Sequence, residues 1–300
     1  MELWIPITIA AAFMQNLRSA LQKYLKGRLS TGGATYSRFF YAVPFALLYL
    51  AALIFVFDFE LPEPNLRFVL FGIGGGLAQI IATFLLVHLF SYRNFAVGNA
   101  YSKTETVQTA LFGIIVLGDA ITAKVALAIL VALSGVMALS MASGKVTLRT
   151  LLTGWTEKPA LIGILSGTMF GASAVFYRAS SLSLGGDGFL AQSSFTLGCV
   201  TIFQAVLMGV YLRMKEPGEF GRVLASWRVA VLVGICGMLG SAGWFTAMTI
   251  QNAAYVRALG QIELVFTFIA STLIFKERST RLEVVGIVLI VSGIILLLLN

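Results

Sequence analysis

Long apolar stretches recur along the whole chain, separated by short connections that are polar or contain glycine and proline. A transmembrane helix needs about 20 predominantly apolar residues. Ten stretches approach or reach this length, over residues 3–24, 35–57, 68–91, 96–117, 121–141, 160–181, 188–212, 229–251, 255–275 and 282–299. The pattern predicts an all-α integral membrane protein with ten transmembrane helices.

The chain also repeats itself, because residues 94–139 align with residues 252–297 without a gap. Two carboxylates that are rare in apolar helices fall in register, Glu105 with Glu263. Apolar composition alone does not explain this coincidence. Further matched pairs are Asn94/Asn252, Thr109/Thr267, Thr122/Thr280, Ser134/Ser292, Gly135/Gly293 and Leu139/Leu297, with charge kept at Asp119/Glu277.

The repeat divides the chain into two five-helix units. The first covers residues 1–141, a connecting loop covers 142–159, and the second unit covers 160–300. Because five is odd, the second unit must enter the membrane in the opposite sense. Such inverted-topology repeats are typical of secondary transporters.

Composition agrees with a membrane protein, because 58% of the residues are hydrophobic, 11% are charged and the mean hydropathy is +0.92. A soluble domain carries about a quarter charged residues, so soluble enzymes and nucleic-acid binders are excluded. The net charge of +8 therefore reflects topology rather than a nucleic-acid partner. Loops on one side hold 15 Lys and Arg, while the other side holds Arg67, Lys124 and Arg178. The positive-inside rule predicts that the richer side is cytoplasmic, with both termini outside and the first span retained.

Residues for metal, redox or nucleotide chemistry are sparse. Cys199 and Cys236 lie in apolar stretches without ligand spacing, and His88 is the single histidine. No phosphate-binding GxxxxGK[ST] sequence occurs. We therefore expect no cofactor and no metal. Paired carboxylates could also do acid–base work in an intramembrane enzyme, but no nucleophile and base accompany them, so we expect no enzyme.

Glu105 and Glu263 are the leading candidates for substrate binding, because ionisable groups inside a membrane usually mark a functional site. Tyr101 and Gln108 share a helical face with Glu105 by their three- and four-residue spacing. The carboxylates could bind an amine or exchange a proton. Alternatively, they form static ion pairs with Lys103, Arg18 or Arg257.

The first span carries a polar stripe of Gln15, Ser19 and Gln22, which either lines the cavity or forms hydrogen bonds between helices. Weaker candidates are Gln79 on the third span and an aromatic set that includes Tyr177 and Trp244. The complete set predicted to bind substrate is Glu105, Glu263, Gln15, Ser19, Tyr101, Gln108, Gln79, Lys103, Trp244 and Tyr177.

Two motifs close corresponding spans of the two units. The fourth span ends in Leu117-Gly118-Asp119-Ala120-Ile121-Thr122 and the ninth in Phe275-Lys276-Glu277-Arg278-Ser279-Thr280, and Ser134-Gly135-Val136 and Ser292-Gly293-Ile294 follow. With ten spans in two halves, the whole chain resembles the EamA family of the drug/metabolite transporter superfamily. Arg38 also resembles a basic residue common at that place in the family.

The resemblance implies secondary transport by alternating access through a central cavity, commonly as export across a bacterial inner membrane, without a cofactor. It also implies cytoplasmic termini, opposite to the charge count. Many relatives carry proline where this chain has Glu105 and Glu263. We expect a multi-pass inner-membrane exporter of small metabolites, chiefly amino acids including aromatic ones, with protons as a candidate coupling ion. Proton-coupled extrusion of cationic drugs is the alternative. Because one chain holds both halves, we expect a monomer.

Overall fold

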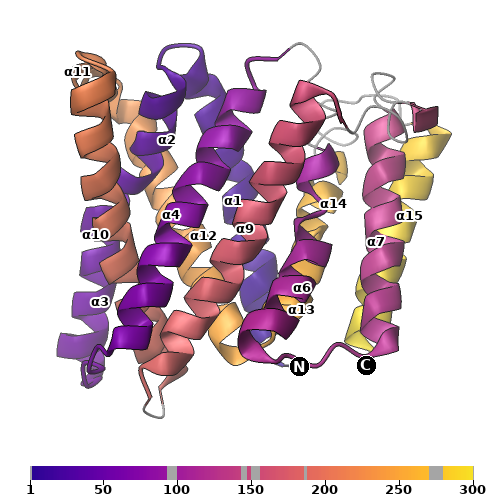
Figure 1. Ribbon diagram of the computed structural model, residues 1–300, viewed down its shortest axis with the longest axis horizontal. Helices are drawn as coiled ribbons and strands as arrows, with labels where there is room; N and C mark the ends of the chain where they lie inside the picture. Colours follow the sequence, from indigo (N-terminus) through magenta and orange to yellow (C-terminus); the bar gives the residue numbers. More distant parts are fainter. Residues whose placement is uncertain are drawn as a thin grey trace.

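The computed structural model is a bundle of helices that run side by side (Figure 1). It describes residues 2–92, 100–142, 147–149, 156–185, 188–269 and 280–299. The helices of the first half are α1 (Trp4–Lys26), α2 (Thr31–Phe40), α3 (Val43–Phe57), α4 (Leu66–Leu89), α6 (Glu105–Leu117) and α7 (Ala123–Ala142). Those of the second half are α9 (Lys158–Ser183), α10 (Phe189–Lys215), α11 (Glu219–Ala225), α12 (Trp227–Ile250), α13 (Ala253–Gly260), α14 (Ile262–Ile269) and α15 (Arg281–Leu298).

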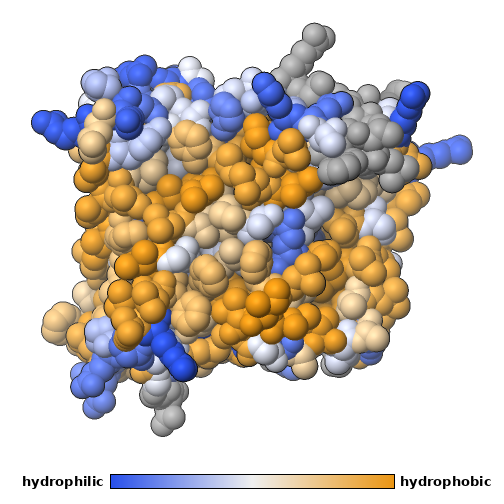
Figure 2. Space-filling view, viewed as in Figure 1, coloured by the Kyte–Doolittle hydropathy of each residue, from blue (hydrophilic) through white to orange (hydrophobic). Residues whose placement is uncertain are grey.

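The face of the bundle shown in Figure 2 is mostly apolar across its middle, apart from a small polar patch, and is more polar at both ends. Large side chains point outward, for example Phe55 at 81% and Ile115 at 77% exposure. Among the described residues, 7 helical segments are long and apolar enough to cross a membrane, with α2 and α3 forming one segment. Apolar surface of this extent belongs in lipid, so the chain is an all-α, multi-pass membrane protein.

The other three predicted spans are more polar or interrupted. The polar stripe lowers the hydropathy of α1, although it has 23 residues. The fourth span is broken by a turn at residues 103–104, so α6 begins only at Glu105. The ninth is divided into α13 and α14 at Gln261. Residues 93–99 and 270–279, which include the predicted start of the fourth span and most of the second closing motif, lie outside the described residues.

The predicted second span bends where α2 gives way to α3. Pro44 is the second residue of α3. Its ring occupies the place of a backbone N–H and clashes with the carbonyl one turn earlier, which ends the preceding helix. The predicted span over residues 35–57 thus lies within one membrane-length segment, Thr31–Phe57, that contains an interruption at residues 41–42.

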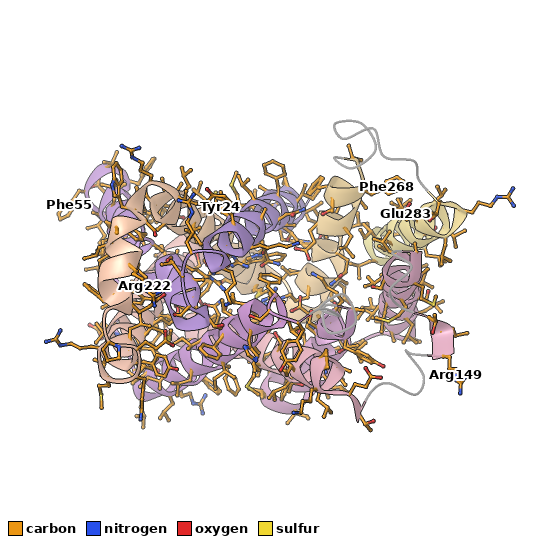
Figure 3. The ribbon with its side chains drawn as sticks, turned by 90° about the horizontal axis from the view of Figure 1, so that it is seen from above. Tyr24, Phe55, Arg149, Arg222, Phe268 and Glu283 are labelled. Carbon is orange, nitrogen blue, oxygen red and sulfur yellow. The ribbon has the colours of Figure 1, made fainter. Side chains whose placement is uncertain are left out.

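A short helix, α11, closes the end of the bundle opposite the two termini (Figure 1). Arg222 on α11 lies at one side of this end and Arg149 at the other (Figure 3). The Glu219 carboxylate of α11 is fully buried and accepts a hydrogen bond from the Ser30 backbone N–H at 2.5 Å. Glu216 accepts a hydrogen bond from the Ser30 hydroxyl, and Arg222 pairs with Glu219. The acidic groups thus bind the amino-terminal end of α2, where a helix favours negative charge.

Helices of the two halves pack in matched pairs. α1 packs on α12, and α4 packs on α9. In terms of the predicted spans, these are the contacts of the first with the eighth and of the third with the sixth, so each contact is the counterpart of the other when the halves are interchanged. α7 packs on α15, and α2 and α3 pack on α10, pairs that the same exchange maps onto themselves. Most contacts between helices therefore join the two halves, although neighbours within one half, such as α10 and α12, also pack together.

Adding a methyl group at Gly135 should loosen the α7–α15 contact. A Cβ atom there would lie 2.6 Å from the backbone O of Gly286 and 2.8 Å from the backbone N of Ile290. Because backbone cannot swing aside, we expect Gly135→Ala to cost about 1–3 kcal/mol, the usual effect of overpacking, and to lower the thermal unfolding midpoint in detergent. Gly221→Ala is the control, since no atom lies within 4 Å of its Cβ position. Equal midpoints for the two variants would contradict the close packing.

Candidate functional site

A cavity of about 260 Å³ lies inside the bundle between the two halves. Its lining comes from α1, the carboxyl end of α4, the residues that precede and begin α6, the middle of α9, and α13 and α14. The lining residues are Gln15, Asn16, Arg18, Ser19, Ala20, Lys23, Leu86, Phe90, Ser102, Lys103, Glu105, Phe170, Arg257, Glu263, Leu264 and Thr267.

Both predicted carboxylates line this cavity, each directly after a break in its span. Glu105 is the first residue of α6, after the turn at residues 103–104. Glu263 is the second residue of α14, after the turn at Gln261. The hydroxyls of Thr109 and Thr267, one turn later, donate to the backbone O of Glu105 at 2.7 Å and of Glu263 at 3.0 Å. The two half-helices thus begin in matching ways.

Each carboxylate pairs with a cation from the opposite half of the chain. The ammonium of Lys103 pairs with the Glu263 carboxylate, and an Arg257 guanidinium nitrogen lies 3.6 Å from Glu105 Oε1. All four residues are largely removed from solvent. The Arg257 guanidinium also lies over the Trp244 ring, 4.9 Å from its centroid. The ion-pair alternative is therefore realised, and it links the two halves.

The polar stripe of α1 reaches across to α14. The Gln15 side-chain amide donates to Glu263 Oε2 at 3.0 Å, and the Asn16 amide donates to Thr267 Oγ1 at 2.8 Å. Ser19 donates to the backbone O of Gln15 at 2.9 Å and lines the cavity. Gln15 thus has both roles considered for the stripe, because it lines the cavity and bonds to another helix, whereas Ser19 lines the cavity and bonds only within α1.

Arg18 differs from Lys103 and Arg257, the other buried cations of the cavity, because it forms no ion pair with a glutamate among the described residues. Its side chain is 4% exposed, and one terminal nitrogen donates to Ser19 Oγ over a long 3.4 Å. Its Nε has no hydrogen-bond partner within the described part of the chain. None of the ion pairs found among the described residues includes it.

Gln79 and Tyr177 lie outside this cavity. The Tyr177 hydroxyl donates to Gln79 Oε1 at 3.0 Å, and the Gln204 amide donates to the same Gln79 oxygen at 2.9 Å. The Tyr177 ring packs against Phe245, with centroids 4.3 Å apart. Gln204 was not singled out in the sequence, although a glutamine within a long apolar helix is itself a signal.

Tyr101, Gln108 and Trp244 also lie away from the lining. The turn at residues 103–104 separates Tyr101 from α6, so the face predicted to carry Tyr101, Glu105 and Gln108 together does not exist as one helical face. Tyr101 packs with Ala160. Gln108 donates to Thr104 at 3.3 Å. Trp244 reaches the site indirectly, through Arg257.

Several lining residues were not singled out as site residues from the sequence, namely Leu264, Lys23, Leu86 and Phe90. Leu264 follows Glu263 directly in the chain, so its position follows from the break before α14. Among the described residues, no group of three His, Cys, Asp or Glu side chains is placed to hold a metal ion. The site offers hydrogen bonds and charges of both signs to a small polar molecule.

Comparison with known proteins bears on the family and the fold. Residues 158–299 match the model of the EamA-like transporter family. One solved crystal structure superposes with a TM-score of 0.74 at 15% sequence identity, over 99% of this chain and 96% of the other, which shows a shared fold. No curated protein matches the chain. The second half of the chain therefore resembles the EamA-like transporter family, a family of the drug/metabolite transporter superfamily, and this similarity indicates a membrane transporter of that type.

Proposed function

We propose that this chain is a secondary transporter that exports small metabolites, chiefly amino acids, across a bacterial inner membrane by alternating access. The observation that carries the proposal is the cavity between the halves, in which each half supplies one carboxylate and one cation that pair with the other half. A site shared in this way can change its access when the halves move relative to each other.

The matched architecture supports an inverted repeat of ten spans. The pairs α1–α12 and α9–α4 are related by exchange of the halves, and both glutamates follow breaks in their spans. Interrupted helices at the substrate site are common in transporters built from inverted repeats. Such breaks leave polar backbone groups near the middle of the membrane, where they need a polar cavity.

The size and lining of the cavity favour a small polar substrate over a drug. Pockets for drug-sized ligands are about 300–1,000 Å³, and this cavity, at about 260 Å³, lies just below that range. Both signs of charge line it. An amino acid carries both signs within a few ångströms and can use both.

The direction of export is inferred from where the cavity lies. Its α1 residues run from Gln15 towards Lys23, at the end of the bundle opposite the termini. The Lys- and Arg-rich connections, including residues 213–228, lie at that end. By the positive-inside rule this end is cytoplasmic, so the cavity lies nearer the cytosol, from which an exporter must take its substrate.

Counterflow in proteoliposomes tests the proposal. We expect exchange of at least one labelled amino acid among phenylalanine, tryptophan, threonine, methionine and lysine, and none of a quaternary ammonium drug. Glu105→Gln should lower the exchange at least tenfold, because it removes a buried charge that lines the cavity and pairs with Arg257. Repeating the assay with a pH gradient tests protons as the coupling ion.

Glu60→Gln is the matched control, since Glu60 lies exposed in the connection between α3 and α4. It should leave exchange unchanged. Drug exchange without amino-acid exchange would replace this proposal with multidrug extrusion. Amino-acid exchange that survives Glu105→Gln would limit Glu105 to packing.

A further inference from the structure

We propose that Arg18 binds a carboxylate of the transported molecule, so that the cavity selects amino acids or organic anions and rejects amines that lack an acid group. This inference rests on the proposed function and names the chemical class that the same site takes. It begins from the balance of charge inside the bundle.

Cations outnumber carboxylates in the cavity. Its charged lining residues are two glutamates against Arg18, Lys23, Lys103 and Arg257. Lys103 and Arg257 are paired with the two glutamates. Lys23 is exposed at the cytoplasmic end of α1. Arg18 is therefore the buried positive charge of the lining that forms no ion pair among the described residues, although Glu263 is near enough to attract it.

Arg18 is enclosed on its other side by a further cation. The side chains of Arg18 and Arg38 both border Gly237, whose Cβ position lies 3.6 Å from Arg18 Cδ and 3.3 Å from Arg38 Cγ. Arg38 is 4% exposed, and its guanidinium donates to the Thr83 hydroxyl at 2.8 Å. Arg38 thus adds positive charge behind Arg18 and offers no anion to it.

A buried cation without an anion is expensive, because its hydration is lost and not replaced. Arginine cannot avoid this cost by losing its proton, since its pKa in water is above 12. An anion that enters the cavity and contacts Arg18 would regain much of the lost energy. The empty protein already bears the free-energy cost of desolvating Arg18, so a bound anion gains from the attraction without adding that cost.

Carboxylate is the anion that fits best. The guanidinium presents a planar fork of N–H groups that matches the two oxygens of a carboxylate, and the Arg18 Nε–H has no partner among the described residues. Ser19 and Gln15 lie beside Arg18 in the lining and can add hydrogen bonds. Glu105 pairs with Arg257 over 3.6 Å, which is longer than a hydrogen bond, so its carboxylate can also accept a hydrogen bond from an ammonium group while the pair is kept.

Competition in the counterflow assay tests the carboxylate requirement with the wild-type protein. Phenylalanine should compete, and 3-phenylpropionate, which lacks the ammonium group, should still compete. Phenylalaninamide, which keeps the ammonium group and lacks the acid, should compete at least tenfold less well than phenylalanine. Equal competition by phenylalanine and phenylalaninamide would overturn the inference.

Variants place the requirement at Arg18. Arg18→Gln should weaken competition by phenylalanine at least tenfold and abolish the preference for phenylalanine over phenylalaninamide. Arg18→Lys should restore only part of this preference, because a lysine ammonium lacks the planar pair of N–H groups of a guanidinium. Arg28→Gln, at an exposed position two residues after the end of α1, should match wild type. If Arg18→Gln does not fold, the Arg18→Lys variant and the wild-type competition of phenylalanine against phenylalaninamide still test the inference.

A binding assay separates this inference from the proposed function. 3-Phenylpropionate should raise the thermal midpoint of the purified wild-type protein, as a ligand of the folded state does, and should have no effect on Arg18→Gln.

Phosphate and sulfate at equal ionic strength test for binding of any anion. Equal stabilisation by phosphate would refute selectivity for carboxylates, and stabilisation that persists in Arg18→Gln would remove Arg18 from the site. Stabilisation without amino-acid exchange would refute the proposed substrate class and keep the anion site.

Discussion

Lys103→Met should destabilise the protein by about 3–5 kcal/mol, the cost of leaving one member of a buried ion pair without its partner. The change strands the Glu263 carboxylate, which is 8% exposed and keeps only the Gln15 amide as a side-chain partner in the described structure. The thermal midpoint in detergent and the yield of monodisperse protein measure the effect. Transport should be lost as well, because the pair lies in the cavity wall.

A double variant separates the effect of the unpaired Glu263 charge from the effect of losing the Lys103 side chain. Lys103→Met combined with Glu263→Gln removes both charges and keeps an amide that can bond to Gln15. Because replacing both members of a buried pair is often close to neutral, we expect most of the lost stability to return while transport stays low. Lys124→Met, at an exposed position, controls for the loss of a lysine. A single variant as stable as wild type would mean that water or lipid headgroups reach Glu263.

Glu219→Ala should open the contact between α11 and α2 and cost about 1–3 kcal/mol, as expected when buried hydrogen-bond donors lose a charged acceptor. The Ser30 backbone N–H would lose its acceptor at 2.5 Å, and the amino-terminal end of α2 would lose its nearby negative charge. Hydrogen exchange of residues 30–34 should quicken, and the thermal midpoint should fall.

Arg222→Gln is the matched control for this contact. Arg222 pairs with Glu219, but its side chain is 62% exposed, and exposed ion pairs contribute about 0–1 kcal/mol. We therefore expect little change. If Arg222→Gln destabilises as much as Glu219→Ala, the ion pair rather than the binding of the α2 end holds α11 in place.

The helical membrane class and five of the cavity residues follow from the sequence. Glu105, Glu263, Gln15, Ser19 and Lys103 all line the cavity. They are polar groups in apolar stretches, and such groups must face a partner or a cavity whatever the details of packing. The cost of placing a polar side chain in lipid depends on that residue and its neighbours in the sequence, so a single sequence is enough to predict it.

The positions of Tyr101 and Gln108 depended on a different argument, which assumed that the fourth span is one continuous helix. The turn at residues 103–104 resets the helical phase, so the two side chains separate. The pairing of Lys103 with Glu263 was equally out of reach. Sequence offered Lys103, Arg18 and Arg257 as partners for the glutamates, and only the packing of the halves selects among them.

The crossed ion pairs limit how the chain can be recombined with another. Residues 1–141 supply Lys103 and Glu105, and each pairs with a charge from the second half, Glu263 and Arg257 respectively. A chimera that joins residues 1–141 to a foreign second half would therefore leave these charges buried without partners, unless the foreign half carries an acid and a base at the matching places. Exchange of one half alone should work only between chains that share both pairs.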